Sequence, residues 1–175
     1  MLSHYFVRDA KEIVWFKTFW GSSVPSLTPE RPSTASFITR LANASQSVSE
    51  VRGTELGQGA KALVCLVKGN GVKQYVLAVL PADCQADLGK LATALGGRRA
   101  GLCSAEEVMD LTGCIFGAVP PVSFHEKLMG IADPTLFTRY KELAFNAGSR
   151  DTSIIIDTQD FHRIVHPREI DFLKK

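Results

Sequence analysis

The chain has 175 residues, enough for one domain with a substantial hydrophobic core. Twenty Lys and Arg against eighteen Asp and Glu leave a formal net charge of only +2, so no DNA partner is expected and any anionic partner must be held by a local patch. No stretch approaches the roughly twenty apolar residues of a membrane helix, and residues 1–20 lack the pattern of a signal peptide. We therefore expect a cytoplasmic protein without a membrane partner.

The sequence predicts an amino-terminal leader followed by a globular domain. Residues 1–34 read as an aromatic leader followed by a linker rich in Ser and Pro, and residues 35–175 as the domain itself. The domain should open with a helix over residues 35–44. A second, capped turn of helix is expected from Ser47 to Gly53.

The clearest element is a β-hairpin. Strands are predicted over residues 61–68 and 73–80, joined by Gly69-Asn70-Gly71, because an Asn-Gly turn accepts the positive φ values that tight hairpins require. The first strand is apolar almost throughout, so it should be central and covered on both faces.

Helices and strands alternate irregularly over the rest of the chain. This irregular order favours a single α+β domain with a mixed, curved, partly barrel-like sheet flanked by helices. The elements expected are a helix over 83–95, a strand over 99–102, a capped helix over 104–111, a buried strand over 114–116, a strand over 128–132, a helical turn over 133–140, a hairpin of 142–146 with 153–156, and a helix over 158–165.

The cysteines and histidines show no metal-binding spacing that would require a cofactor. No C-x-x-C pair occurs, so the four cysteines are interpreted as reduced thiols, although a nucleophilic Cys65 or Cys114 stays open as an alternative. His162 and His166 could share a metal, but a solvated helix face is the better interpretation. His125 is the histidine expected nearest a pocket.

Lys61 is the leading candidate for a functional residue. It follows a glycine-punctuated loop, residues 53–60, and begins a buried strand, where an ammonium group needs an anion or a cleft. A lysine on a rigid strand can hold a phosphate or carbonyl oxygen as a point charge. The alternative is a lysine whose stem is buried and whose head reaches solvent.

The segment Gly117-Ala118-Val119-Pro120-Pro121 could supply the opposite wall of such a cleft. Glycine permits close approach of a ligand, and two prolines keep the loop rigid, so its N–H groups could serve as donors to a developing oxyanion. The alternative is an ordinary tight turn.

These segments together resemble the YbaK/prolyl-tRNA synthetase-associated editing family, in particular its free-standing YeaK-type branch. The resemblance rests on residues 51–64, on the Gly69-Asn70-Gly71 hairpin and on Gly117 to Pro121, and it extends over about residues 46–174. It implies a trans-acting aminoacyl-tRNA deacylase that hydrolyses the ester between a wrong amino acid and the terminal adenosine of tRNA. No metal or organic cofactor is implied.

The resemblance also implies roles for particular residues. Lys61 stands where the family has an essential lysine, and the loop from Gly117 through Ala118, Val119, Pro120 and Pro121 stands where the family contacts the aminoacyl end. Asn146, Gly148 and Ser153 stand at positions that line the pocket and vary with substrate.

The sequence also departs from the family pattern. The family's first helix and strand are not recognisable in residues 1–45. Ala62 and Asn146 differ from cysteine-specific relatives, so the amino acid removed stays open.

Two alternatives to this enzyme are retained. A non-catalytic module of the same fold would bind a tRNA end, a nucleotide or a synthetase without turnover. A thiol hydrolase would be inactivated by alkylation, whereas an enzyme that depends on Lys61 would resist it. An aminoacyl-tRNA synthetase is also left open as a partner.

Overall fold

The protein is an α+β domain in which two sheets meet. The computed structural model describes residues 35–38, 49–50, 52–150 and 152–175. Along the chain the elements are β1 (Ala35–Ile38), the 3-10 helix η1 (Leu56–Gln58), β2 (Ala60–Gly69), β3 (Val72–Pro81), α3 (Leu88–Ala94), β4 (Arg99–Leu102), α4 (Ala105–Thr112), β5 (Leu128–Ala132), the 3-10 helix η2 (Pro134–Phe137), β6 (Glu142–Asn146), β7 (Thr152–Asp157), α5 (Thr158–Val165) and β8 (Arg168–Glu169).

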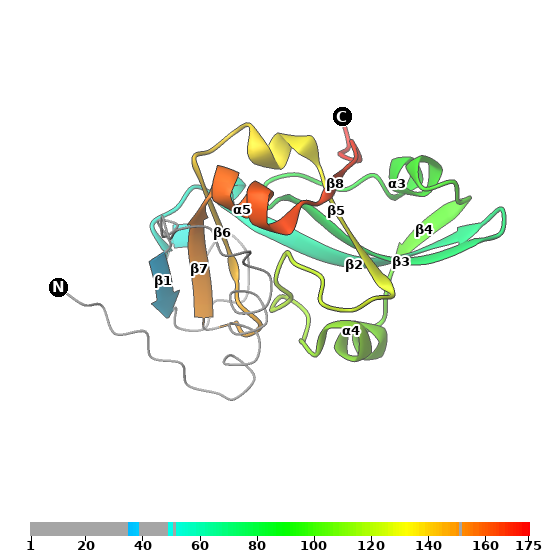
Figure 1. The fold of residues 1–175 in the computed structure, drawn as a ribbon, viewed down its shortest axis with the longest axis horizontal. Helices are drawn as coiled ribbons and strands as arrows, with labels where there is room; N and C mark the ends of the chain where they lie inside the picture. The colour runs from blue at the N-terminus through cyan, green and yellow to red at the C-terminus, as the bar shows by residue number, and fades with distance from the viewer. Residues whose placement is uncertain (1–34, 39–48, 51, 151) are drawn as a thin grey trace, which may run out of the picture.

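The larger sheet is mixed, as the sequence predicts. Its strand order is β4-β2-β3-β5-β8, with parallel pairing between β3 and β5 and between β5 and β8. The smaller sheet, β1-β7-β6, is antiparallel and lies at the end of the molecule away from the tip of the β2–β3 hairpin (Figure 1). Within the described residues, a bridge between Gly59 and Ala144 connects the two sheets.

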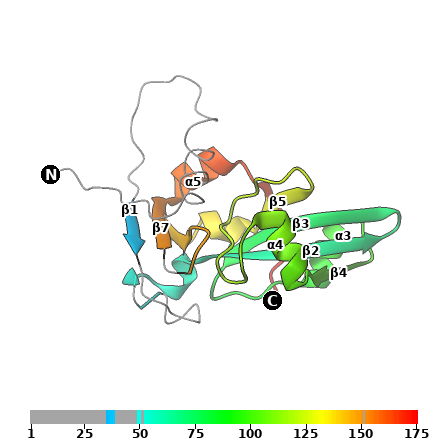
Figure 2. The ribbon, with the colours of Figure 1, turned by 90° about the horizontal axis from the view of Figure 1, so that it is seen from below.

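The long β2–β3 hairpin forms the centre of the domain, and both of its faces are covered. Val64 and Leu77 pack into one hydrophobic cluster with α4, α5 and the smaller sheet. Their neighbours Cys65 and Val76 point the other way, into a cluster with α3 and the carboxyl-terminal Phe172. Figures 1 and 2 show α3 and α4 on opposite sides of the hairpin. The predicted apolar strand, covered on both faces, is therefore confirmed.

Local signals predict several elements correctly. Asn70 and Gly71 have φ of 52° and 78° at the hairpin turn, as the Asn-Gly pair requires. Ser104 and Glu107 form the expected capping box at the start of α4. The strand over 128–132, the hairpin of β6 with β7, and the helix over 158–165 are also confirmed.

Two predictions near the amino terminus need comment. The helix expected over 35–44 is wrong where it can be compared, because residues 35–38 form β1 and pair with β7, Ala35 lying opposite Ile155. Pairing with a strand more than a hundred residues away overrides the local helical pattern. Residues 39–44 of that helix, the start of the capped turn at Ser47, and the leader and linker of residues 1–34 lie outside the described residues.

Two further segments differ from their prediction. The helix expected from residue 83 begins only at Leu88, because Asp87 is its N-cap and accepts hydrogen bonds from Gly89 N and Lys90 N. The buried strand expected over 114–116 is absent from the described fold. Instead, Ile115 and Phe116 are 51% and 49% exposed in a turn that leads to Gly117. The helical turn after Asp133 is the short η2.

Candidate functional site

A cavity of about 340 Å³ lies where the two sheets meet. Its walls come from the segment before β2, the start of β2, the end of β6 and the turn before Val119. The described residues that line it are Ser49, Arg52, Thr54, Leu56, Gly59, Ala60, Lys61, Ala62, Ala82, Phe116, Gly117, Val119, Ala144, Phe145, Asn146 and Arg150. The cavity therefore brings Lys61 and Gly117 together, although they lie far apart in the sequence.

The ammonium of Lys61 is held by a turn of the backbone. Its Nζ donates to the carbonyl oxygen of Cys84 at 2.7 Å and to that of Ala82 at 3.4 Å. Burial lowers the pKa of Lys61, and the nearby Cys84 and Asp83 oppose that shift. Because an ammonium group has three N–H donors, one donor remains for a ligand in the cavity.

An ion pair fixes the turn that receives Lys61. Arg139 donates to both carboxylate oxygens of Asp83, at 2.7 and 2.6 Å, and so lowers the pKa of that carboxyl. Gly57 lies directly against this pair, since a Cβ there would come within 2.8 Å of the Asp83 carboxylate. The glycine-punctuated loop thus approaches the ion pair where a larger residue would not fit.

The turn that contains Gly117 is fixed by side chains of the β6–β7 hairpin. Arg150 donates to the Phe116 carbonyl oxygen through Nε at 3.1 Å and Nη2 at 2.8 Å, and the Asn146 amide donates to the Gly117 carbonyl oxygen. Gly117 has φ of 80°, which a residue with a side chain rarely adopts. The N–H groups of Gly117 and Val119 donate to no acceptor in the described part of the chain, so both can serve a ligand.

Arg52 joins this turn to the smaller sheet. Its guanidinium donates to the Asn146 side-chain oxygen at 2.6 Å and to the Ser153 hydroxyl at 2.9 Å. Burial lowers the pKa of Arg52 to about 10, and no carboxylate pairs with it among the described residues. Asn146 thereby has a fixed orientation, with its oxygen toward Arg52 and its nitrogen toward Gly117.

The candidate residues fall into two groups. Lys61, Gly117, Val119 and Asn146 line the cavity. The remaining candidates lie behind its wall: Ala118, Pro120, Pro121 and Ser153 are buried, and Gly148 donates from its N–H to the Ala118 carbonyl oxygen at 3.1 Å. These five stand outside the described lining.

Sequence reasoning assigned no role to several residues of the lining, among them two arginines and an exposed phenylalanine. Arg52, Phe116 and Arg150 come from separate segments, and their proximity depends on the tertiary fold. Together with Lys61, the two arginines place three cations on a lining that has no Asp or Glu among its described residues. Because the net charge of the chain is small, an anionic partner has to be bound by a local basic patch, and these three side chains form one.

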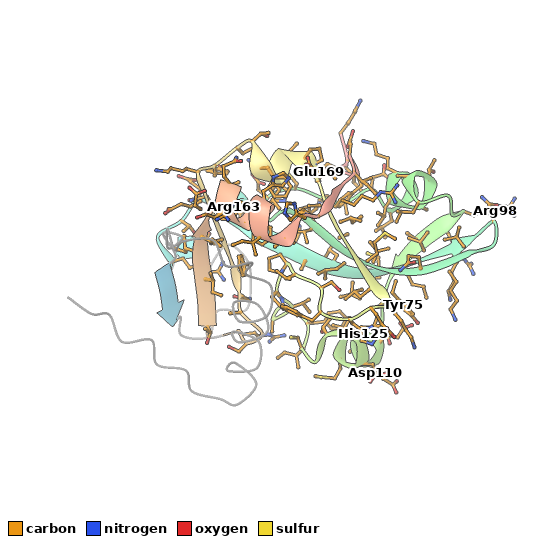
Figure 3. The ribbon with its side chains drawn as sticks, in the orientation of Figure 1. Tyr75, Arg98, Asp110, His125, Arg163 and Glu169 are labelled. Carbon is orange, nitrogen blue, oxygen red and sulfur yellow. The ribbon has the colours of Figure 1, made fainter. Side chains whose placement is uncertain are left out.

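The basic residues elsewhere do not extend this patch. Figure 3 shows Arg98 at the tip of the β2–β3 hairpin and Arg163 on α5, on the other side of the molecule. His125 lies near a pocket as expected, but it lines a separate cavity that also contains His166 and not the one that Lys61 lines. His162 lies 3.0 Å from Glu169.

The cysteines give no support to a thiol nucleophile. All four are free. Burial raises the pKa of Cys65 to about 12, which disfavours the thiolate, and Cys114 is buried. In the described residues, no three His, Cys, Asp or Glu side chains are grouped as metal ligands, and no helix has the length and apolar character needed to cross a membrane.

Comparison with known proteins identifies the family. The model of the aminoacyl-tRNA editing domain matches residues 39–164. The chain belongs to the aminoacyl-tRNA editing domain family. The family predicted from the sequence is therefore confirmed.

Curated relatives of this editing domain confirm the predicted activity. Two Escherichia coli proteins, from strains K12 and O157:H7, each named Multifunctional Ser/Thr-tRNA deacylase ProXp-y, are 61% identical over 127 residues. The match covers 73% of this chain and 76% of each relative. The chain is thus a trans-acting aminoacyl-tRNA deacylase, a hydrolase that acts on mischarged tRNA.

More distant solved structures share the fold of the editing domain. One, described as a candidate trans-editing enzyme for prolyl-tRNA synthetase, is 20% identical with a TM-score of 0.76, over 98% of this chain and 100% of that one. Another, of the hypothetical protein APE2540, is 19% identical with a TM-score of 0.73, over 94% of this chain and 99% of that one. Both confirm the α+β fold.

We expect Arg139→Ala to slow deacylation although Arg139 does not line the cavity. Without the ion pair, Asp83 and its turn can move, and Lys61 loses well-placed acceptors. Misplacement of this kind costs up to roughly 100-fold in rate, whereas a partly exposed ion pair contributes only about 1 kcal/mol to stability.

Single-turnover rates and thermal unfolding of the same samples test this expectation. Arg163→Ala is the matched control, because it breaks the ion pair between Arg163 and Asp160 on α5, and neither residue is part of the described cavity lining. Equal single-turnover rates for Arg139→Ala and Arg163→Ala would refute a role for the Asp83 turn in placing Lys61.

Proposed function

We propose that this editing domain removes serine and threonine from mischarged tRNA, with Lys61 and Gly117 as its catalytic residues. The observation that carries the proposal is that these two residues, far apart in the sequence, line one cavity together with Arg52 and Arg150. The identity of 61% with proteins named Ser/Thr-tRNA deacylases supports the choice of amino acids.

The geometry supports a mechanism of ester hydrolysis by electrostatic stabilisation. The third N–H of Lys61 and the N–H groups of Gly117 and Val119 would donate to the carbonyl oxygen as it gains negative charge. A water molecule attacks the carbonyl carbon, and the ester bond to the ribose breaks. The ribose hydroxyl next to the ester can assist the proton transfer from water to the leaving oxygen.

Selectivity would come from the size and the polarity of the cavity. A volume of about 340 Å³ leaves limited room beside the terminal ribose, so large side chains are excluded. Thr54 lines the cavity, and its hydroxyl has no hydrogen-bond partner among the described residues. We assign to Thr54 a hydrogen bond with the hydroxyl of a bound serine or threonine.

The other candidate residues would act by holding this lining in place. Asn146 fixes the Gly117 carbonyl, Ser153 holds Arg52, and Gly148 holds the Ala118 carbonyl. The buried Pro120 and Pro121 keep the following segment rigid. In this proposal only Val119 and Asn146 among the predicted substrate-binding residues contact the substrate.

Three broader expectations belong to the same proposal. The editing unit would comprise residues 35–175, because β1 completes the smaller sheet. It would act in the cytoplasm, where aminoacyl-tRNA is made and used. An aminoacyl-tRNA synthetase is the protein partner we propose, supported by the fold shared with a candidate trans-editing enzyme for prolyl-tRNA synthetase.

A panel of mischarged tRNAs tests the proposal. We expect release of serine and threonine to be fastest, valine to be slower because it is similar in size to threonine but lacks the hydroxyl, and leucine or phenylalanine to be excluded by size. Several tRNA bodies carrying the same amino acid separate selectivity for the amino acid from selectivity for the tRNA. Equal rates for all amino acids would reject the proposed selection by the cavity.

A further inference from the structure

Phe116 is an exposed aromatic side chain at the edge of the cavity. It is 49% exposed, its neighbour Ile115 is 51% exposed, and Phe116 itself lines the cavity. A single exposed apolar residue needs no explanation, but adjacent exposed residues beside a ligand cavity favour a binding role. The apolar run from Cys114 was predicted to be buried, so its exposure is a property of the fold that local sequence does not explain.

The backbone that carries Phe116 is held firmly. Arg150 donates two hydrogen bonds to the Phe116 carbonyl oxygen, and Asn146 donates one to the next carbonyl, that of Gly117. Three hydrogen bonds to two consecutive carbonyl groups limit the movement of the backbone that carries the ring. A ring carried on a firmly held backbone is suited to stacking, because less conformational freedom is lost when a flat ligand binds.

The chemistry around Phe116 fits a nucleotide. Arg52, Lys61 and Arg150 provide positive charge on the same cavity, and its described lining has no carboxylate. Proteins recognise single-stranded RNA with this combination: cationic side chains bind the phosphate backbone, and aromatic rings stack on the bases. The acceptor end of tRNA is single-stranded, and its last base adjoins the ester that the cavity hydrolyses.

We propose that Phe116 is the stacking platform for the base of the terminal adenosine, with the Arg150 guanidinium holding the backbone that carries the ring beside the cavity. The inference rests on the proposed function, since the ester must enter the cavity for the adenine to reach Phe116. Phe116 is then a substrate-binding residue. It recognises the flat face of a base, while the chemical step depends on Lys61 and Gly117.

Kinetics with seryl-tRNA test the platform. Phe116→Ala should raise KM roughly 5- to 150-fold, the range that base–aromatic stacking gives on alanine substitution, with kcat at saturating tRNA changed much less. Phe116→Tyr should keep the KM of the wild type. Phe116→Leu keeps apolar bulk but has no ring, and it should behave like Phe116→Ala even if the alanine variant folds poorly. Phe124→Ala is the matched control, because Phe124 is 47% exposed but lines the second cavity.

A fluorescence measurement gives a readout that a merely structural role would not change. A tRNA ending in 2-aminopurine in place of adenine should show a change in emission on binding the wild type and Phe116→Tyr, and none on binding Phe116→Leu. If wild type deacylates seryl-tRNA but Phe116→Leu keeps both the wild-type KM and the emission change, the platform is refuted and the proposed function stands. If wild type does not release serine, the proposed function fails first.

Discussion

Replacement of Lys61 by alanine is expected to lower the single-turnover rate of seryl-tRNA deacylation roughly 10²- to 10³-fold, the usual loss when one preorganised donor to an oxyanion is removed. The Lys61 ammonium is held by the Cys84 and Ala82 carbonyl oxygens, and in the proposed mechanism its third N–H donates to the substrate. Replacing Lys61 by alanine removes the positive charge that β2 contributes to the cavity. The rate of serine release from pre-charged tRNA measures the effect.

Lys68→Ala is the matched control for this variant. Lys68 lies on the same strand, β2, but is exposed and outside the cavity lining. It should therefore retain the wild-type rate. A normal rate for Lys61→Ala, or an equal loss for Lys68→Ala, would contradict the role assigned to Lys61.

The pH dependence of the wild-type rate gives a second check on Lys61. Burial lowers the pKa of this lysine, so the ammonium loses its proton at a lower pH than an ordinary lysine, whose pKa is about 10.4. Activity that needs the cation is then present at neutral pH and falls as the pH rises through the lowered pKa. Lys61→Arg should shift this loss to higher pH, because a guanidinium keeps its proton.

Replacement of Gly117 by alanine is expected to reduce deacylation by roughly ten-fold or more. At φ of 80° a side chain costs about 1–2 kcal/mol, which the turn can relieve only by rotating its backbone. Space is not the obstacle, since a Cβ at Gly117 would lie 3.6 Å from Arg150 Nε, an ordinary contact. Rotation would turn the Gly117 and Val119 N–H groups away from the substrate carbonyl, and the single-turnover rate measures that loss.

Gly113→Ala separates strain from catalysis. Gly113 has φ of 66° at the end of α4, nothing lies within 4 Å of a Cβ there, and the residue is not part of the described cavity lining. Both variants should lose similar amounts of unfolding free energy, but only Gly117→Ala should lose activity. Similar rates for the two variants would mean that the Gly117 turn supplies no donors.

Elements set by nearby residues could be predicted from the sequence. The Asn70-Gly71 turn between β2 and β3 and the Ser104 capping box depend on contacts within a few residues. The same holds for the apolar pattern of β2, whose neighbouring side chains pack into clusters on opposite faces. The place of Lys61 in a cavity could also be predicted, because a cation at the start of such a strand needs an anion or a cleft.

The parts that could not be predicted depend on contacts between distant segments. β1 is a strand only because β7 pairs with it. The turn that holds Lys61 was predicted as the first part of a helix. Asp83 and Asp87 are both suitable N-cap residues, and the structure uses Asp87, so α3 begins only at Leu88. Arg52 reaches Asn146 across 94 positions in the sequence, a distance at which no local pattern indicates contact.

Turnover of seryl-tRNA by substoichiometric wild-type protein tests the central claim most directly. A deacylase should release many serine molecules per protein molecule, whereas a module that only binds the tRNA end should not turn over. We predict multiple turnovers for the wild type and almost none above the spontaneous background for Lys61→Ala. Binding of seryl-tRNA by the wild type without serine release above that background would contradict the account.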